Sequence, residues 1–214
     1  MFDNREQAGV DLAQRLRELE LVDPIVLGIP RGGVVVAAAI ARELGAELDV
    51  VLARKLRAPH NSEFAIGAVD EDGEVVRNAE SIGLFDISEA YIQQEKERQI
   101  REIAQRKELY RAVRPTAFLK GRSVIVADDG LATGSTMIAA LHAVRKNGPC
   151  EIVMAVPVAC PDRLREAEKL ADQTVCLLAP LGFTAVGVFY ADFRPVDDEE
   201  VIDCLKEAMH LAGP

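Results

Sequence analysis

The sequence predicts an α/β protein built on a mainly parallel sheet that is flanked by helices. Short β-branched runs recur along the chain, each bounded by charged residues, Gly or Pro. Segments with helical apolar spacing lie between these runs, and Gly45 and Gly148 follow two of them, where glycine commonly ends a helix. Alternating strands and helices of this kind are typical of a parallel sheet covered on both faces.

The individual elements follow from the same patterns. Strands that are buried on both faces are apolar along most of their length, and the expected strands are residues 25–29, 48–53, 123–128, 152–157 and 174–178. The expected helices are residues 33–44, 135–147, 162–170 and 197–211. The last of them begins with acidic residues, which suits the positive end of the helix dipole.

Two regions interrupt the alternation. Residues 55–63 are polar and contain Pro59, so we expect a loop there, followed by a hairpin of residues 65–69 and 74–77 that turns at Asp72 and Gly73. Residues 86–114 predict a long, highly charged inserted helix. Asp86 and Glu89 have the spacing of a capping box, and a sparse apolar stripe follows at Ile92, Ile100, Ile103, Leu109 and Val113.

Composition excludes several classes of protein. A chain of 214 residues with 49% apolar and 28% charged residues predicts one globular domain over residues 1–214. The net charge of −10 argues against nucleic acid as the main partner, because phosphate neutralisation needs a basic face. The first 16 residues have no apolar signal core, and no run approaches the roughly 18 apolar residues of a membrane span. We therefore expect a cytoplasmic protein that does not enter a membrane.

The strongest chemical signal lies in residues 124–136. An apolar strand ends in Asp128 and Asp129, and a turn rich in glycine and hydroxyl groups then opens a helix; the turn comprises Gly130, Leu131, Ala132, Thr133, Gly134, Ser135 and Thr136. Backbone N–H groups at a helix start bind phosphate, and ligands of open parallel sheets bind at the carboxyl ends of strands. Carboxylates bind sugar hydroxyls by charge-assisted hydrogen bonds. The segment therefore predicts a sugar phosphate site.

Two other phosphate motifs do not fit. A Walker A loop requires Lys after its final glycine, and Ser135 follows Gly134. The turn after the first strand reads Gly28-Ile29-Pro30-Arg31-Gly32-Gly33, which is not the G-x-G-x-x-G pattern of dinucleotide-binding proteins.

The strand, the acid pair and the sequence T-G-S-T resemble the signature of the type I phosphoribosyltransferases, and the resemblance extends from Ile25 to about Asp192. It is most similar to a bacterial branch without a settled acceptor. The resemblance implies binding of 5-phosphoribosyl 1-pyrophosphate (PRPP), with Asp128 and Asp129 on the ribose hydroxyls. It also implies that Gly130 and residues 132–136 hold the 5-phosphate, and that Pro30, Arg31, Gly32 and Gly33 hold the pyrophosphate through a cis peptide.

The resemblance implies further roles. Arg54 and Lys55 fall where the family places catalytic basic groups near pyrophosphate, and residues 55–63 would be a loop that closes over the reaction. Mg²⁺ would enter with PRPP, and Asp192 matches an acid that some members place near the metal. A small hood, built from the N-terminal residues, residues 181–193 or the long helix, would recognise a nitrogenous base. The oligomeric state stays open, with a homodimer as the family's common arrangement.

One departure from the family leaves the function open between alternatives. Purine-salvage members usually carry Asp at the position of Ala132, where it assists proton movement on the base. Ala132 cannot do this, so the acceptor is not determined. The leading interpretation is a phosphoribosyltransferase. A PRPP-sensing regulator of weak catalytic power is the second interpretation, and an interaction protein that uses the charged helix is the third.

Overall fold

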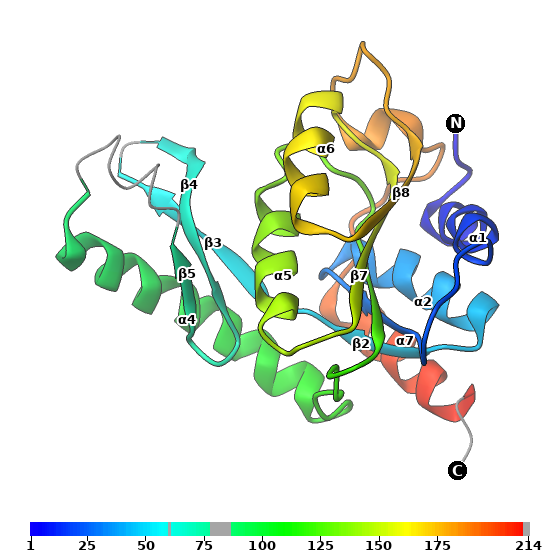
Figure 1. Ribbon diagram of the computed structural model, residues 1–214, viewed down its shortest axis with the longest axis horizontal. Coiled ribbons are helices and arrows are strands. Elements are labelled where there is room, and N and C mark those ends of the chain that lie inside the picture. Colours follow the sequence, from blue (N-terminus) through cyan, green and yellow to red (C-terminus); the bar gives the residue numbers. More distant parts are fainter. Residues whose placement is uncertain (60, 78–86, 212–214) are drawn as a thin grey trace.

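A five-stranded parallel sheet forms the centre of the protein, in the strand order β2-β1-β6-β7-β8. The computed structural model describes residues 1–59, 61–77 and 87–211 (Figure 1). The strands of this sheet are β1 Ile25–Gly28, β2 Glu47–Val50, β6 Ser123–Ala127, β7 Glu151–Val158 and β8 Gln173–Leu178. The predicted fold class, a mainly parallel sheet flanked by helices, is confirmed.

Alternate residues of the central strands face opposite layers of the core. Val26 of β1 and Ile125 of β6 pack in one apolar cluster, whereas Leu27 and Val126 pack in another. Both faces are therefore covered, which explains why these strands are apolar without interruption. The sequence pattern that predicted them is the direct consequence of this burial.

Helices cover the two faces of the sheet from opposite sides (Figure 1). One layer holds α1 Arg5–Leu16, α2 Gly32–Leu44 and α7 Asp198–Leu211, and the other holds α5 Ser135–Arg145 and α6 Pro161–Ala167. Gly45 has a φ of 63° directly after α2, as its position in the sequence predicted. The helix α1 was not predicted. It packs so closely on α2 that a methyl group at Gly9 would lie 2.6 Å from the carbonyl oxygen of Val36.

A second, antiparallel sheet has the order β3-β4-β5, with strands Ala53–Ala58, Asn61–Asp70 and Val75–Arg77. The predicted hairpin between β4 and β5 is confirmed, and Gly73 takes a φ of 77° in its turn. The predicted loop at residues 55–63 is wrong, because β3 and β4 pair across most of it. Leu56 and Ala58 are buried and alternate with basic residues, a strand pattern that the high charge obscured. His60 lies outside the described residues.

The predicted strand 48–53 is divided between the two sheets. β2 ends at Val50, and β3 begins at Ala53. The apolar run is continuous because Val51 and Leu52, which join the strands, are themselves buried. Within the described residues, no helix combines the length and the apolar character needed to cross a bilayer.

The long charged helix is α4, Glu89–Arg111. Ser88 caps it, because its side-chain oxygen accepts a hydrogen bond from the Tyr91 N–H at 3.3 Å. The predicted capping box is therefore wrong, and Asp86 lies outside the described residues. The helix is also less exposed than its charge indicated, since Ile103 and Tyr110 are buried against the core.

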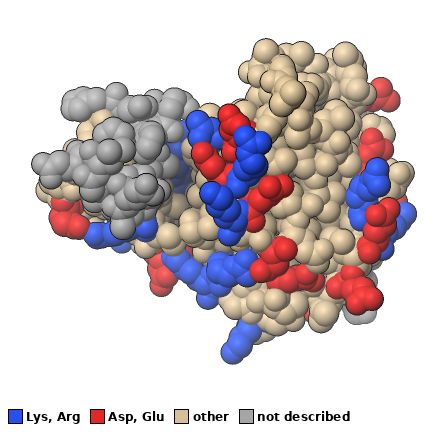
Figure 2. All heavy atoms as spheres, turned by 45° about the horizontal axis from the view of Figure 1, so that its top comes forward, with Lys and Arg blue, Asp and Glu red and all other residues tan. Residues whose placement is uncertain are grey.

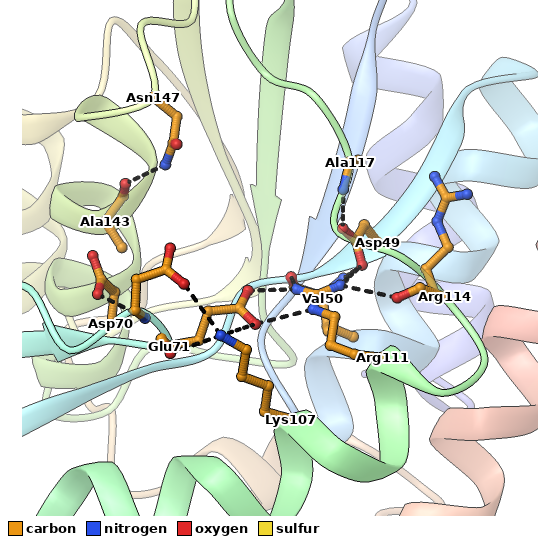
Figure 3. A network of polar contacts seen from close by, with 11 residues as sticks. Asp49, Val50, Asp70, Glu71, Lys107, Arg111, Arg114, Ala117, Ala143 and Asn147 are labelled. Carbon is orange, nitrogen blue, oxygen red and sulfur yellow. Dashed lines mark hydrogen bonds and ion pairs between the residues drawn. The ribbon is translucent and has the colours of Figure 1, made fainter.

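A buried ionic network ties the end of α4 to both sheets (Figure 3). Arg111 pairs with Asp49 of β2 at 2.6 Å and with Glu71, in the β4–β5 turn, also at 2.6 Å. The Asp49 carboxylate additionally accepts a hydrogen bond from the Ala117 N–H at 2.9 Å. Burial raises the pKa of Asp49 even though Arg111 lies against it. Arg111 thus compensates a buried negative charge and joins the two sheets.

We predict that Arg111→Met destabilises the protein by about 3–5 kcal/mol, because it leaves a buried carboxylate without its cation. Urea unfolding at neutral pH measures the change. Arg145→Met is the matched control, since Arg145 pairs with Asp172 on the surface and such pairs contribute about 0–1 kcal/mol. If the two variants lost the same free energy of unfolding, the buried network would stabilise the fold no more than a surface pair does.

Candidate functional site

The candidate site begins with the pairing of β1 and β6. These strands are parallel neighbours, with Gly28 opposite Ala127, and the Ile29 N–H donates to the Ala127 carbonyl at 2.9 Å. Their following loops therefore leave the same edge of the sheet side by side. This is the edge at which open α/β sheets bind their ligands.

The loop after β1 carries the residues predicted to bind pyrophosphate. The peptide bond between Pro30 and Arg31 is cis, and α2 begins directly afterwards at Gly32. A methyl group at Gly33 would lie 2.8 Å from the Cα atom of Asp128. Gly33 is therefore required by close contact with the neighbouring loop, and Arg31 lies exposed beside it.

The loop after β6 ends in an open helix start. Gly134 takes a φ of 74° and precedes α5, whose first turn has no acidic residue and receives no side-chain cap. Ala132, Thr133 and Thr136 are exposed, whereas Ser135 is buried. The first N–H groups of this helix are thus left for a ligand or solvent, as phosphate binding requires.

Two hydrogen bonds and one packing contact hold this loop in place. Leu131 donates its N–H to the Val158 carbonyl at 2.8 Å and accepts a hydrogen bond from the Cys160 N–H at 2.8 Å. A methyl group at Gly130 would lie 2.5 Å from the Val186 side chain. Gly130 is therefore needed for packing against Val186, a role that the sequence did not indicate.

The two acids after β6 lie in different surroundings. Asp129 pairs through Oδ2 with Arg5 Nε at 2.8 Å, and its carbonyl accepts a hydrogen bond from the Tyr190 hydroxyl at 2.6 Å. Asp128 accepts a hydrogen bond from the Asp129 N–H at 2.9 Å. Burial, followed by the charge of Asp129, raises the pKa of Asp128 well above its usual value. Burial also raises the pKa of Asp129, and Arg5 opposes that rise.

A cavity of about 180 Å³ lies next to the two loops and brings four predicted residues together: Pro30, Arg54, Lys55 and Thr136. Arg54 turns toward α4, where its Nε donates to Gln99 at 2.8 Å and its guanidinium pairs with Glu102 at 2.6 Å. The charge of Arg54 is therefore neutralised by a carboxylate of α4.

Arg57 and Arg106 also line this cavity, and the sequence reasoning missed both. Nε of Arg57 is buried without a hydrogen-bond partner. For Arg106, the available signal was helical spacing, because Gln99, Glu102 and Arg106 share a face of α4. On the face shown in Figure 2, basic and acidic side chains are interleaved, so a positive site depends on a few placed cations.

Asp192, the predicted metal ligand, lies in a different place. Its carboxylate accepts a hydrogen bond from the Arg194 N–H at 3.1 Å, and it lines a separate cavity of about 140 Å³ with Arg5 and Glu200. Within the described part of the chain, no group of three His, Cys, Asp or Glu side chains is arranged to hold a metal ion.

The N-terminal residues and the segment 183–194 form an aromatic cluster beside Asp129. The ring centroid of Tyr190 lies 5.3 Å from that of Phe2 and 5.0 Å from that of Phe193. Cζ of Arg5 lies over the Phe193 ring, 3.9 Å from its centroid. Two of the segments predicted as candidates for the hood therefore lie together. Arg5 and Tyr190, which contact Asp129, carried no local signal.

We predict that Asp128→Asn stabilises the ligand-free protein at pH 8. Because the folded-state pKa of Asp128 is raised, the native state binds a proton more tightly than the unfolded chain, and stability falls as pH rises through that pKa. Asparagine avoids this loss. Thermal melting measures the gain, since each kcal/mol appears as roughly 2–4 °C in a chain of this size.

The gain should shrink toward pH 4, because native Asp128 is protonated there and much of the unfolded chain's Asp128 is protonated as well. Asp203→Asn, at an exposed position of α7, should show no comparable effect. A gain of the same size at pH 4 and pH 8 would contradict the assignment of the effect to ionisation.

We also predict that Gly33→Ala destabilises the protein, because the added methyl group meets the backbone of the neighbouring loop. Overpacking costs about 1–3 kcal/mol, and the better helix propensity of alanine offsets at most about 1 kcal/mol. Gly182→Ala is the control, since open space surrounds Gly182. Chemical denaturation of both variants measures the difference, and an unchanged Gly33→Ala protein would disprove the close approach.

Known proteins similar to this chain point to one family. A model of the phosphoribosyl transferase domain matches residues 3–192. Two curated proteins, from Mycobacterium tuberculosis strains CDC 1551 and H37Rv, are 40% identical to the chain over 208 residues, which is 97% of this chain and 47% of each relative. Both are named "Putative phosphoribosyl transferase". The chain thus spans about half the length of these relatives.

Solved structures agree with this result. TT1426 from Thermus thermophilus superimposes with a TM-score of 0.91 at 48% identity, covering 96% of this chain and 98% of that one. The AQ2163 protein from Aquifex aeolicus has a TM-score of 0.50 at 15% identity over 82% of this chain and 74% of that one, and it shows the fold alone. From the match to the domain over residues 3–192 and the identity to both relatives, the chain belongs to the phosphoribosyl transferase domain family.

Proposed function

We propose that this chain is a glycosyltransferase that binds PRPP and transfers its 5-phosphoribosyl group to a nitrogenous acceptor, with release of pyrophosphate. The observation that carries the proposal is the meeting of two ligand loops at one edge of the sheet, after β1 and after β6. Membership of the phosphoribosyl transferase domain family supports the same substrate class.

The start of α5 would bind the 5-phosphate. Its uncapped N–H groups and the exposed hydroxyls of Thr133 and Thr136 supply donors, and the helix dipole adds positive potential. Gly130, Ala132, Gly134 and Ser135 would contribute backbone to the same cradle. Asp128 and Asp129 would then accept hydrogen bonds from the ribose hydroxyls.

The loop from Pro30 to Gly33 would bind the pyrophosphate, next to the basic cavity. Arg54 and Lys55 line that cavity and would neutralise the departing pyrophosphate. Arg54 would exchange its partner Glu102 for a phosphate oxygen. Because the described residues do not form a metal site by themselves, we propose that Mg²⁺ arrives bound to PRPP, consistent with its preference for phosphate oxygens. It would neutralise charge on the leaving group.

In the proposed reaction, the bond from the anomeric carbon to a pyrophosphate oxygen breaks, and a bond from the acceptor nitrogen to that carbon forms. The nitrogenous acceptor loses a proton, which would pass to the departing pyrophosphate or to water. Positive charge grows on the ribose, so the protein must hold the sugar, neutralise the leaving group and exclude water. Ala132 has no side-chain group that could take up a proton. This favours a nitrogenous substrate that loses its proton without help from position 132.

The presence of Ala132 is also compatible with a second function. A protein that binds PRPP at these loops and lacks a base at Ala132 would serve as a PRPP sensor with weak catalysis. The two functions share the binding site and differ in turnover. Release of pyrophosphate with a panel of purine, pyrimidine and other nitrogenous acceptors separates them.

We predict that Mg²⁺–PRPP raises the melting temperature. At 100 times its dissociation constant, a ligand stabilises a protein by about 2.7 kcal/mol, which corresponds to roughly 5–11 °C here. Asp128→Asn should weaken PRPP binding by roughly 10- to 100-fold, because it removes charge-assisted hydrogen bonds to the sugar. Asp128→Asn with Asp129→Asn should abolish binding in a protein that still folds.

Each variant is compared with its own ligand-free melting temperature, and Asp203→Asn serves as the control outside the site. Calorimetric titration gives the affinities directly. Unchanged affinity in the folded double variant would refute the ribose assignment, and failure of the native protein to bind Mg²⁺–PRPP would refute the proposed function.

A further inference from the structure

Arg5 is a buried cation that joins segments far apart in the chain. Its residue is 8% exposed, although it stands at the first position of α1. Its Nε pairs with Asp129 at 2.8 Å, and its Nη1 donates to the Arg194 carbonyl at 2.8 Å. The guanidinium plane also lies 3.9 Å from the ring centre of Phe193. A cation is buried at such a place only when its partners compensate the loss of water.

The pair lies directly against the loop that would hold pyrophosphate. A methyl group at Gly32 would lie 2.7 Å from Arg5 Nε and would collide with Oδ2 of Asp129. The backbone at the end of the loop after β1 therefore packs against the ion pair of Arg5 and Asp129. Through one guanidinium, Arg5 contacts both loops and the C-terminal segment that follows Tyr190.

The electrostatic surroundings give Arg5 a defined task. The charged or titratable groups that face the Asp129 carboxylate are Asp128 from the same loop, Tyr190 from the C-terminal segment and Arg5 from α1. Burial raises the pKa of Asp129, while the hydrogen bond and charge of Arg5 lower it. The pair uses Oδ2 of Asp129, and Oδ1 is not part of it. A sugar hydroxyl donates best to a carboxylate that is ionised.

We propose that Arg5 is a positioning residue of this site, which holds Asp129 as an ionised acceptor for the sugar and fixes it beside the pyrophosphate loop. This inference rests on the proposed function. Arg5 acts through Asp129 and the loop backbone, so its removal should change how PRPP affinity depends on pH.

The test compares Arg5→Met, Arg5→Lys and the control Arg42→Met. Arg42 also joins α1 to α2, through an exposed pair with Glu6 at 2.7 Å, and it lies outside the site. Calorimetric titration with Mg²⁺–PRPP from pH 6 to pH 9 gives the affinities. A carbon-13 chemical-shift titration of the Asp129 carboxyl in the ligand-free proteins reports its ionisation separately from that of Asp128.

In Arg5→Met we expect affinity at pH 7 to fall roughly tenfold or more, since the hydrogen bond between Asp129 and the sugar is weakened. The loss should diminish as pH rises, because Asp129 without Arg5 ionises at higher pH. Arg5→Lys should recover part of the affinity, and Arg42→Met should match the native protein. The carboxyl titration of Asp129 should move to higher pH in Arg5→Met.

The outcomes separate the two claims. If the native protein does not bind Mg²⁺–PRPP, the proposed function fails, and the ligand role of Arg5 fails with it. If the native protein binds and Arg5→Met binds equally well, the inference alone is wrong. A loss of equal size at every pH, with an unmoved Asp129 titration, would also overturn it, because that pattern reflects a structural role only.

Discussion

The parallel pairing of β1 with β6 is the contact on which the whole site depends. With Gly28 opposite Ala127, the two strands end at the same level, and the loops that follow are brought into contact. The contact is so close that Gly33 has no room for a methyl group against Asp128. A shift of this register would move one loop away from the other and separate the predicted phosphate, sugar and pyrophosphate residues.

Around this contact, cations of the protein form ion pairs with its own carboxylates. Arg5 pairs with Asp129, and Arg54 pairs with Glu102 of α4. Such pairing explains how a chain with a net charge of −10 keeps several buried or half-buried cations at one edge of its sheet. At Arg54, an anionic ligand would have to replace the Glu102 carboxylate, with less net gain than at an unpaired cation.

The second sheet and α4 form the outer wall of the basic cavity, and their attachment is ionic as well as apolar. Figure 1 shows α4 with β3, β4 and β5 extending from the main body, and Figure 3 shows the network at the base of this extension. Arg111 holds α4 to Asp49 of the central sheet and to Glu71 of the second sheet. Arg57 and Arg106 are thereby presented to the cavity from elements anchored to the core.

The central strands, most of their helices and the loops after β1 and β6 were predictable from local patterns. Apolar runs, helix-ending glycines and the turn after Asp129 depend on their own stretch of sequence. The helix α1 was not predicted. The pairing of β3 with β4, the partner of Arg54 and the role of Arg5 were not predictable in this way. Arg5 and Asp129 stand 124 residues apart, and nothing near either one indicates the other. Ion pairs of this kind depend on which surfaces come into contact when the layers pack together. The periodicity of the sequence reports local conformation and does not determine those long-range contacts.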